Sequence, residues 1–68
     1  MYSLIFFTNV LHLLDDLGVT KNELAERAGL PFPFLLELTD GRSIATLDIM
    51  DSIAGALNVP LPPLLEYN

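Results

Sequence analysis

Apolar and polar positions separate onto opposite faces over the first stretch of the chain, residues 3–17. On a helical wheel the apolar side covers about half of the circumference, wider than the stripe of about 100° that a surface helix needs. This pattern predicts a first helix deeply embedded in a small bundle. The alternative is that its Phe6 or Leu13 edge contacts a second molecule. Gly18 is expected to end the helix as its C′ residue. The apolar side consists of Leu4, Phe6, Phe7, Val10, Leu11, Leu13, Leu14 and Leu17.

A short second helix is predicted over residues 21–28. Thr20 stands directly before it and Glu23 follows three residues later, which is the spacing of a capping box. Arg27, near the end of the helix, is expected to pair with Glu23 or to offset the helix dipole. Gly29 stands where the helix must stop and the chain must turn sharply, a position that favours a residue free to adopt positive φ.

A third helix is expected after this turn, because Leu35 and Leu38 resume the apolar spacing. A proline disfavours α geometry in the residue before it, so Pro33 is expected to start the helix and to leave Phe32 extended. Two short helices that cross through such a turn form a helix-turn-helix, here over about residues 20–39. In DNA-binding proteins the second of these helices enters the major groove.

The last part of the chain predicts one longer helix and one short helix. Thr46 is a suitable N-cap for a helix over residues 47–57, in which Gly55 costs about 1 kcal/mol relative to alanine unless a neighbour approaches closely. The short helix is expected over about residues 62–67. The longer helix is expected to bury Leu47, Met50, Ile53, Ala54 and Leu57, and the short one to cover the core with Leu61, Leu64 and Leu65. Together these elements predict a compact, all-α, five-helix domain spanning residues 1–68.

Composition is typical of a small cytoplasmic protein with a well-supplied core. Of the 68 residues, 51% are hydrophobic and none is cysteine, so disulfides and thiolate metal sites are excluded. The apolar amino end has no basic segment before it, and its apolar run is broken from Thr8 onward. Neither a secretory signal nor a membrane span is therefore expected.

The charge balance is acidic, with nine Asp and Glu residues against three Lys and Arg residues and a net charge of −6. Nucleic-acid binders usually carry a basic patch, because much of their affinity comes from neutralising phosphates. Net charge bears on association more than on fold. The acidic balance therefore weakens a DNA-binding interpretation and leaves the helix-turn-helix prediction unchanged.

No residue pattern in the chain indicates catalysis or a bound cofactor. His12 is the single histidine, and a metal site would need more ligands. The acidic pairs Asp15/Asp16 and Asp48/Asp51 are typical of solvated helix faces. Neither a glycine-rich phosphate loop nor a serine nucleophile motif is present. We therefore expect no enzymatic activity, no metal and no cofactor.

Two long segments carry a family pattern: LGVTKNELAERAGLPFPFLLELTDGRS and LDIMDSIAGALNVPLPPLLE. From about residue 9 to residue 66, without a gap, the chain resembles the Cro/C1-type (XRE) helix-turn-helix domain of phage and plasmid repressors. The second segment is most similar to plasmid-encoded regulators of transfer and maintenance genes. The resemblance implies a lambda-repressor-like fold and transcriptional repression by a dimer bound to double-stranded operator DNA.

The resemblance also implies four phosphate-contacting positions. Lys21 falls where members usually carry a glutamine that reaches the DNA backbone. Arg42 falls just after the third helix, where a lysine or arginine commonly meets a phosphate. Ser43 and Thr46 fall where loop amides and hydroxyls do the same, close to a helix N-terminus.

The expected base-reading positions depart from the family pattern. Members usually place serine at 31 and 36 and polar or basic residues at 32 and 33, whereas this chain has Pro31, Phe32, Pro33 and Leu36, followed by Glu37. Apolar groups can contact thymine methyls and glutamate can accept from cytosine N4, but neither makes the bidentate contacts that supply most discrimination. An exposed apolar patch rimmed by acids is more typical of a protein-binding surface.

Two functions therefore remain open. The first is a dimeric DNA-binding regulator whose residues 32, 33, 36 and 37 touch bases. The second is an acidic helix-turn-helix domain turned to protein–protein interaction, which binds another regulator through a surface formed by Phe32 and Leu36. Dimerisation is expected on either interpretation, because one small helix-turn-helix contacts too few base pairs to be specific alone. Its interface is expected on the first helix or on residues 61–67.

Overall fold

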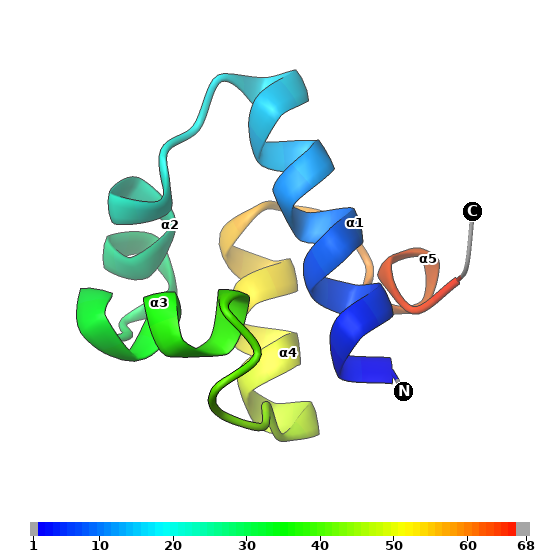
Figure 1. The fold of residues 1–68 in the computed structure, drawn as a ribbon. Coiled ribbons are helices and arrows are strands. Elements are labelled where there is room, and N and C mark those ends of the chain that lie inside the picture. The colour runs from blue at the N-terminus through cyan, green and yellow to red at the C-terminus, as the bar shows by residue number, and fades with distance from the viewer. Residues whose placement is uncertain (1, 67–68) are drawn as a thin grey trace.

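The computed structural model describes residues 2–66, and five helices form within this range. They are α1 (Tyr2–Leu17), α2 (Lys21–Ala28), α3 (Phe32–Thr39), α4 (Leu47–Ala56) and α5 (Leu61–Leu64). Figure 1 shows α2 and α3 together on one flank of α4, with α1 and α5 on the other flank. The described range holds no strand, which confirms the predicted all-α architecture. None of the helices within it combines the length and the hydropathy that crossing a bilayer requires.

Two helices begin at a threonine that caps them, as the sequence predicts. The Thr20 hydroxyl oxygen accepts a hydrogen bond from the Glu23 amide over 3.1 Å, and the Thr46 hydroxyl oxygen accepts one from the Ile49 amide over 3.2 Å. Each bond satisfies an amide that has no partner inside its helix. The Glu23 carboxylate faces Arg27, whose Nη2 lies 3.5 Å from its Oε2. The predicted ion pair within α2 is thus confirmed.

The four longer helices all end at a residue with left-handed backbone geometry. Gly18, Gly29, Gly41 and Asn58 have φ angles of 68°, 71°, 77° and 58°. In each case the amide of the next residue donates to the carbonyl five positions earlier, at distances between 2.8 and 3.1 Å. This is the Schellman motif, which satisfies carbonyls left free at the helix end. The predicted ends at Gly18 and Gly29 are confirmed, and Asn58 gives α4 an ending of the same kind.

The helix α3 begins at Phe32, so the prediction that Pro33 starts it is wrong by one residue. Pro31 is the extended N-cap, with φ −60° and ψ 136°, and its carbonyl accepts from the Leu35 amide over 3.1 Å. Pro33 therefore stands in the first turn, where its ring has no helical carbonyl four residues back to clash with. The bias that a proline exerts on the preceding residue does not keep Phe32 out of the helix.

Buried apolar side chains from every helix form one core cluster. Leu35 and Leu38 of α3 are at most 2% exposed, in agreement with the predicted spacing. The predicted burial of Leu47 is wrong, because its side chain is 67% exposed. Leu47 is the first residue of α4, and Figure 1 shows this first turn extending past the neighbouring helices. The core consists of Phe6, Phe7, Val10, Leu14, Leu24, Ala25, Leu35, Leu38, Ala45, Met50, Ile53, Ala54, Leu57 and Leu64.

The helix α1 is embedded along its middle and open near its two ends. Phe6 and Val10 have no exposed surface, whereas Leu4 and Leu17 are 68% and 53% exposed. The alternative in which the Phe6 edge contacts a second molecule is therefore wrong, since the core of the same chain already covers this side chain. Leu13 is half-buried and packs against that core.

The helix α5 covers the core at the carboxyl end of the chain, as predicted. Leu64 is buried, and Leu61 and Leu65 pack against the core while remaining half-buried. The helix begins at Leu61, one residue earlier than expected, with Pro60 as its extended N-cap. The helix also ends earlier than predicted, because it stops at Leu64 with Leu65 as its C-cap and Glu66 is not helical. Tyr67, the predicted last residue, lies outside the described residues.

A polar side chain on α1 holds the segment that follows α5. Asn9 Nδ2 donates to the carbonyl oxygens of Leu64 and Glu66, both over 2.9 Å. One amide group therefore satisfies two carbonyls at a helix end that lacks a glycine cap. The contact ties the end of the described chain to its first helix.

Candidate nucleic-acid interface

The helix-turn-helix consists of α2, the turn at Gly29, and α3. The helix α3 packs against α2, and the burial of Leu35 and Leu38 fixes which of its faces points outward. Figure 1 shows α3 at the margin of the molecule, on the opposite flank from α5. An outward second helix in this position is the one that enters the major groove in DNA-binding proteins of this architecture.

The four residues predicted to read bases are open to solvent to different degrees. Pro33 and Glu37 are exposed, Phe32 is 38% exposed, and Leu36 is half-buried. Phe32 and Leu36 stand four residues apart and therefore share one side of α3. The outer side of α3 is thus a partly open apolar strip, and Glu37 is the one charged residue on this helix.

Arg42 lies on the turn that follows α3. Its amide donates to the Glu37 carbonyl over 2.8 Å, and Gly41 supplies the left-handed residue of the turn. Its guanidinium Nη2 lies 3.3 Å from Asp40 Oδ2, and both side chains are more than half exposed. The arginine predicted to meet a phosphate is therefore paired with a carboxylate of its own loop.

Ser43 links this loop to the outer side of α3. Its hydroxyl donates to Glu37 Oε1 over 3.1 Å. Ser43 is half-buried, whereas Glu37 is exposed. A residue predicted to contact phosphate and a residue predicted to read a base thus contact each other.

The other two predicted phosphate contacts stand at the starts of helices. Lys21 is the first residue of α2 and is half-buried. Thr46 directly precedes α4 and is exposed, and its hydroxyl oxygen accepts from the α4 backbone. The hydroxyl hydrogen of Thr46 is still free to donate to another acceptor. The four predicted residues are therefore distributed over the start of α2, the α3–α4 loop and the start of α4, and their contact with DNA stays a prediction.

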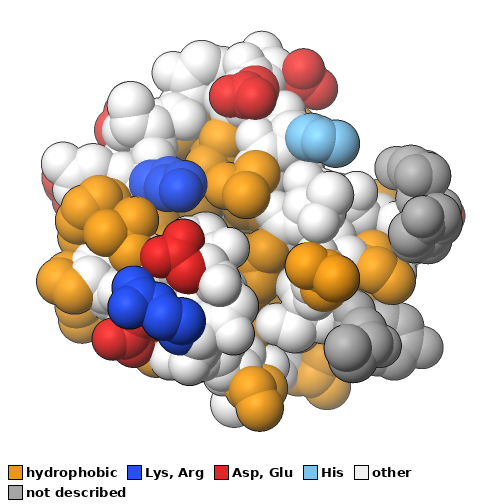
Figure 2. Space-filling view, in the orientation of Figure 1, with side chains coloured by type: hydrophobic (Ala, Val, Ile, Leu, Met, Phe, Trp, Pro, Cys, Tyr) orange, Lys and Arg blue, Asp and Glu red, His pale blue; other side chains and the backbone are white. Residues whose placement is uncertain are grey.

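The face that carries α2 and α3 has no continuous basic surface. Figure 2 shows blue basic side chains interleaved with red acidic ones, with orange hydrophobic side chains beside them over α3. The three cations of the chain, Lys21, Arg27 and Arg42, all lie in the helix-turn-helix or in the loop after it. Of the three, Lys21 alone has no carboxylate within ion-pair distance among residues 2–66.

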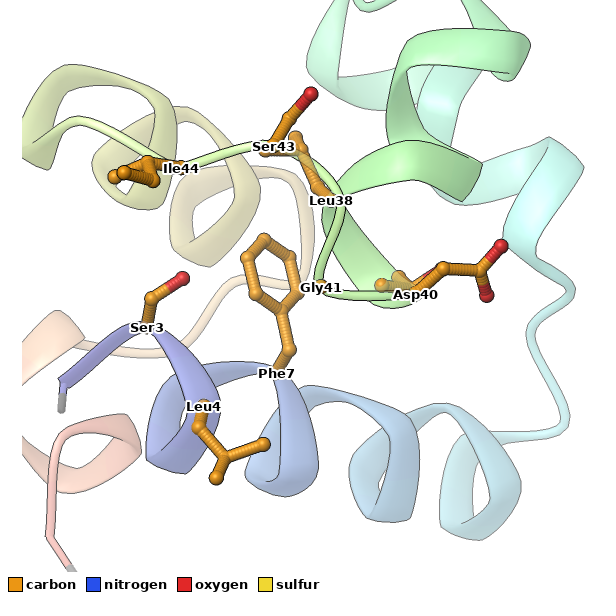
Figure 3. Close-up of a pocket in the computed structure, with 9 residues that line it drawn as sticks. Ser3, Leu4, Phe7, Leu38, Asp40, Gly41, Ser43 and Ile44 are labelled. Carbon is orange, nitrogen blue, oxygen red and sulfur yellow. The ribbon is translucent and has the colours of Figure 1, made fainter.

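A groove of about 350 Å³ lies beside this face, between the first turns of α1 and the α3–α4 loop (Figure 3). The Phe7 ring points from α1 toward the loop at Gly41. Leu4 and Ile44 line the groove and are 68% and 87% exposed. Leu47 follows three residues after Ile44 and is also exposed. Apolar surface is therefore open at this end of the molecule.

Metal-binding chemistry has no support among the described residues. Within residues 2–66 no group of three or more His, Cys, Asp or Glu side chains is arranged to hold a metal ion. His12 is exposed on α1 and lines a groove of about 440 Å³ together with Asp16 and residues of α5. Two potential ligands are fewer than a structural or catalytic metal site requires.

A family model described as helix-turn-helix matches residues 12–64, a range that includes all of α2, α3 and α4. Comparison with curated proteins and with solved structures gave no match. The matched family consists of DNA-binding regulators and is not a family of enzymes. The chain therefore belongs to the Cro/C1-type helix-turn-helix family of DNA-binding regulators.

Proposed function

We propose that this chain is a transcriptional repressor that binds double-stranded operator DNA as a homodimer. The observation that carries the proposal is the position, around the open side of α3, of the groups that are predicted to contact phosphate. Lys21 precedes this helix on α2, while Arg42, Ser43 and Thr46 follow it on the loop and at the start of α4. In helix-turn-helix complexes the first helix crosses the DNA backbone while the second enters the major groove.

The residues have separate roles in this proposal. Lys21 and Arg42 neutralise phosphates, and the hydroxyls of Ser43 and Thr46 donate to phosphate oxygens, which fixes the register of the protein on the duplex. On α3, the apolar side chains of residues 32, 33 and 36 contact thymine methyl groups. Glu37 accepts a hydrogen bond from the N4 amino group of cytosine. The expected operator is therefore rich in thymine, with a cytosine opposite Glu37.

The direct test is a fluorescence-anisotropy titration with duplexes selected from a randomised pool. We expect binding at ~20 mM salt, where charges are weakly screened. The salt slope should be no steeper than about −4 per dimer, because two cations per subunit each release about 0.9 counterions. Lys21→Gln and Arg42→Gln should weaken binding uniformly across sequences, while Arg27→Gln, in the ion pair of α2, serves as the matched control. Absence of duplex binding at ~20 mM salt would refute the proposal.

The apolar surface at the amino-terminal end of α1 is the better supported site for self-association. Leu4 and Ile44 are the most exposed large apolar side chains of the described residues. In the other candidate interface, residues 61–67, Leu61 and Leu65 already pack against the core. We therefore place the dimer interface around Leu4 and Ile44.

The joint packing of α1 to α5 around one core also supports treating residues 1–68 as a single domain.

The second candidate function is binding of another regulator through Phe32 and Leu36. The net charge of −6 and the exposure of Phe32 favour it, because apolar residues rimmed by acids suit a protein interface better than a phosphate backbone. The test compares the proteins captured by the wild type and by a Phe32→Ala/Leu36→Ala variant with an intact fold. Identical partners and an unchanged oligomeric state would remove the support for this function.

A further inference from the structure

We propose that Asp40 and Glu37 occupy Arg42 and Ser43 in the free protein and must be displaced before a DNA phosphate can bind there. We call these two contacts, Arg42 with Asp40 and Ser43 with Glu37, the acidic latch. The inference rests on the proposed function, because it describes how the same interface is controlled. It assigns a role to Asp40, and it assigns Glu37 a second role beside the base contact of the proposed function.

The first contact competes directly with phosphate. Arg42 Nη2 lies 3.3 Å from Asp40 Oδ2, and the left-handed geometry of Gly41 turns the chain between them. A carboxylate and a phosphate are recognised by the same guanidinium fork, so Asp40 fills a position that a phosphate would take. Because both side chains are more than half exposed, the pair is weak and a phosphate can replace it. Breaking the Arg42–Asp40 pair to bind phosphate lowers DNA affinity by up to about fivefold, which is the upper value for exposed ion pairs.

The second contact excludes phosphate because it uses the one hydrogen that the Ser43 hydroxyl can donate. A serine hydroxyl has one hydrogen to donate, and Ser43 donates it to Glu37 Oε1 over 3.1 Å. A phosphate oxygen that approached Ser43 would find no donor and would meet the Glu37 carboxylate at close range, where like charges repel. Glu37 must therefore leave Ser43 before this hydroxyl can serve the DNA backbone.

A cytosine base gives Glu37 an alternative hydrogen-bond partner to Ser43. Glu37 is exposed on the outer side of α3, and the N4 amino group of cytosine donates to carboxylates in the major groove. On a duplex with cytosine at this position, Glu37 exchanges the Ser43 hydroxyl for the cytosine amino group and frees Ser43 for a phosphate. On other sequences Glu37 stays on Ser43, close to the backbone, and repels it. The latch thus raises specificity by weakening binding to incorrect sites.

The test compares two double variants that change the net charge equally. Glu37→Ala/Asp40→Ala opens the latch, and Asp16→Ala/Glu66→Ala removes the same two residue types from the flank that carries α5. Affinity for a non-specific duplex is measured at ~150 mM salt, where charges more than about 8 Å apart are largely screened. We expect the latch variant to bind about two- to fivefold tighter than the wild type, and the control to change by less than about twofold. The salt slope of the latch variant should steepen by up to about one unit per subunit.

The outcomes separate the inference from the proposed function. Equal gains in the two double variants, with unchanged slopes, would leave only net charge as the explanation and would overturn the latch alone. Failure of the wild type and of both variants to bind any duplex at ~20 mM salt would overturn the latch together with DNA binding. Binding by the latch variant alone supports both.

Selection of preferred sites gives an independent readout of Glu37. Glu37→Ala should lose the preference for cytosine at one position of the selected sites, whereas Asp40→Ala should retain it, because Asp40 contacts Arg42 and no base in this proposal. A cytosine preference that is the same in both variants would contradict the exchange of Glu37 between Ser43 and the base.

Discussion

Gly55 is exposed inside α4, with a helical neighbour on each side along the chain. A methyl group on its α carbon would have no atom of another element within 4 Å. The helix-propensity cost of this glycine, about 1 kcal/mol relative to alanine, is therefore not offset by close packing. The position carries a local defect that a single methyl group can repair.

We expect Gly55→Ala to raise the free energy of unfolding by about 0.5–1 kcal/mol, because alanine restricts the unfolded chain and favours the helix. For a domain of this size each kcal/mol corresponds to roughly 4–8 °C in Tm. Thermal unfolding followed by circular dichroism measures the shift. Gly29→Ala is the matched control and should lower Tm, since its φ of 71° disfavours a side chain. A lower Tm for Gly55→Ala would mean that something contacts this face of α4.

The candidate site could be foreseen from the sequence only as a set of positions. Family resemblance indicated Arg42 and Ser43, and the structure places both on the loop after α3. Their partners were not foreseen, although Asp40 precedes Arg42 by two residues with a glycine between them. In the structure the left-handed Gly41 lies between them, and Arg42 Nη2 is 3.3 Å from Asp40 Oδ2. Side-chain pairing across a turn depends on backbone angles that residue type alone leaves open.

At the scale of elements, helix ends follow from neighbouring residues, and most could be predicted for that reason. Thr20 and Thr46 lie just before their helices, and the hydroxyl oxygen of each accepts a hydrogen bond from one backbone amide of the helix that follows. The start of α3 differs from the prediction by one residue because Pro31 is the extended N-cap and Phe32 is helical although Pro33 follows it. The exposure of Leu47 could not be predicted, since it depends on how far α4 extends beyond its neighbours.

Removal of either threonine cap should destabilise the fold by a similar amount. Thr20→Ala and Thr46→Ala each lose one cap hydrogen bond, for which we expect about 1 kcal/mol in urea unfolding. DNA binding should separate the two, because only Thr46 is proposed to contact a phosphate. Thr46→Ser retains both the cap and the donor and should restore stability and affinity. Equal DNA affinities of the two alanine variants would argue against a phosphate contact at Thr46.

Each chain has a net charge of −6, so the two subunits of a dimer repel each other electrostatically. Self-repulsion between them weakens as salt screens it. Binding to DNA responds in the opposite direction, because counterion release is lost at high salt. Self-association and DNA binding should therefore have different salt optima, and measurements at a single salt concentration would misjudge one of them.

Sedimentation equilibrium at micromolar concentration tests the proposed dimer surface. We expect the wild type to dimerise more strongly as salt increases, and Leu4→Glu to remain monomeric because it places a charge in the apolar contact. Leu17→Glu is the matched control on the other end of the same helix, where the side chain is also exposed, and it should dimerise normally. A wild type that stays monomeric at every salt concentration, or a dimeric Leu4→Glu variant, would contradict the interface.

The Asn9 contact with the segment after α5 has a practical consequence for joining copies of the chain. It holds the end of the described chain beside α1, on the flank opposite α2 and α3. A short flexible linker between two copies would therefore leave from the flank away from α3 and keep the α3 helix of both copies accessible. Such a tandem protein would raise the effective concentration of the second copy to the millimolar range. Operator recognition could then be measured without any dependence on subunit concentration.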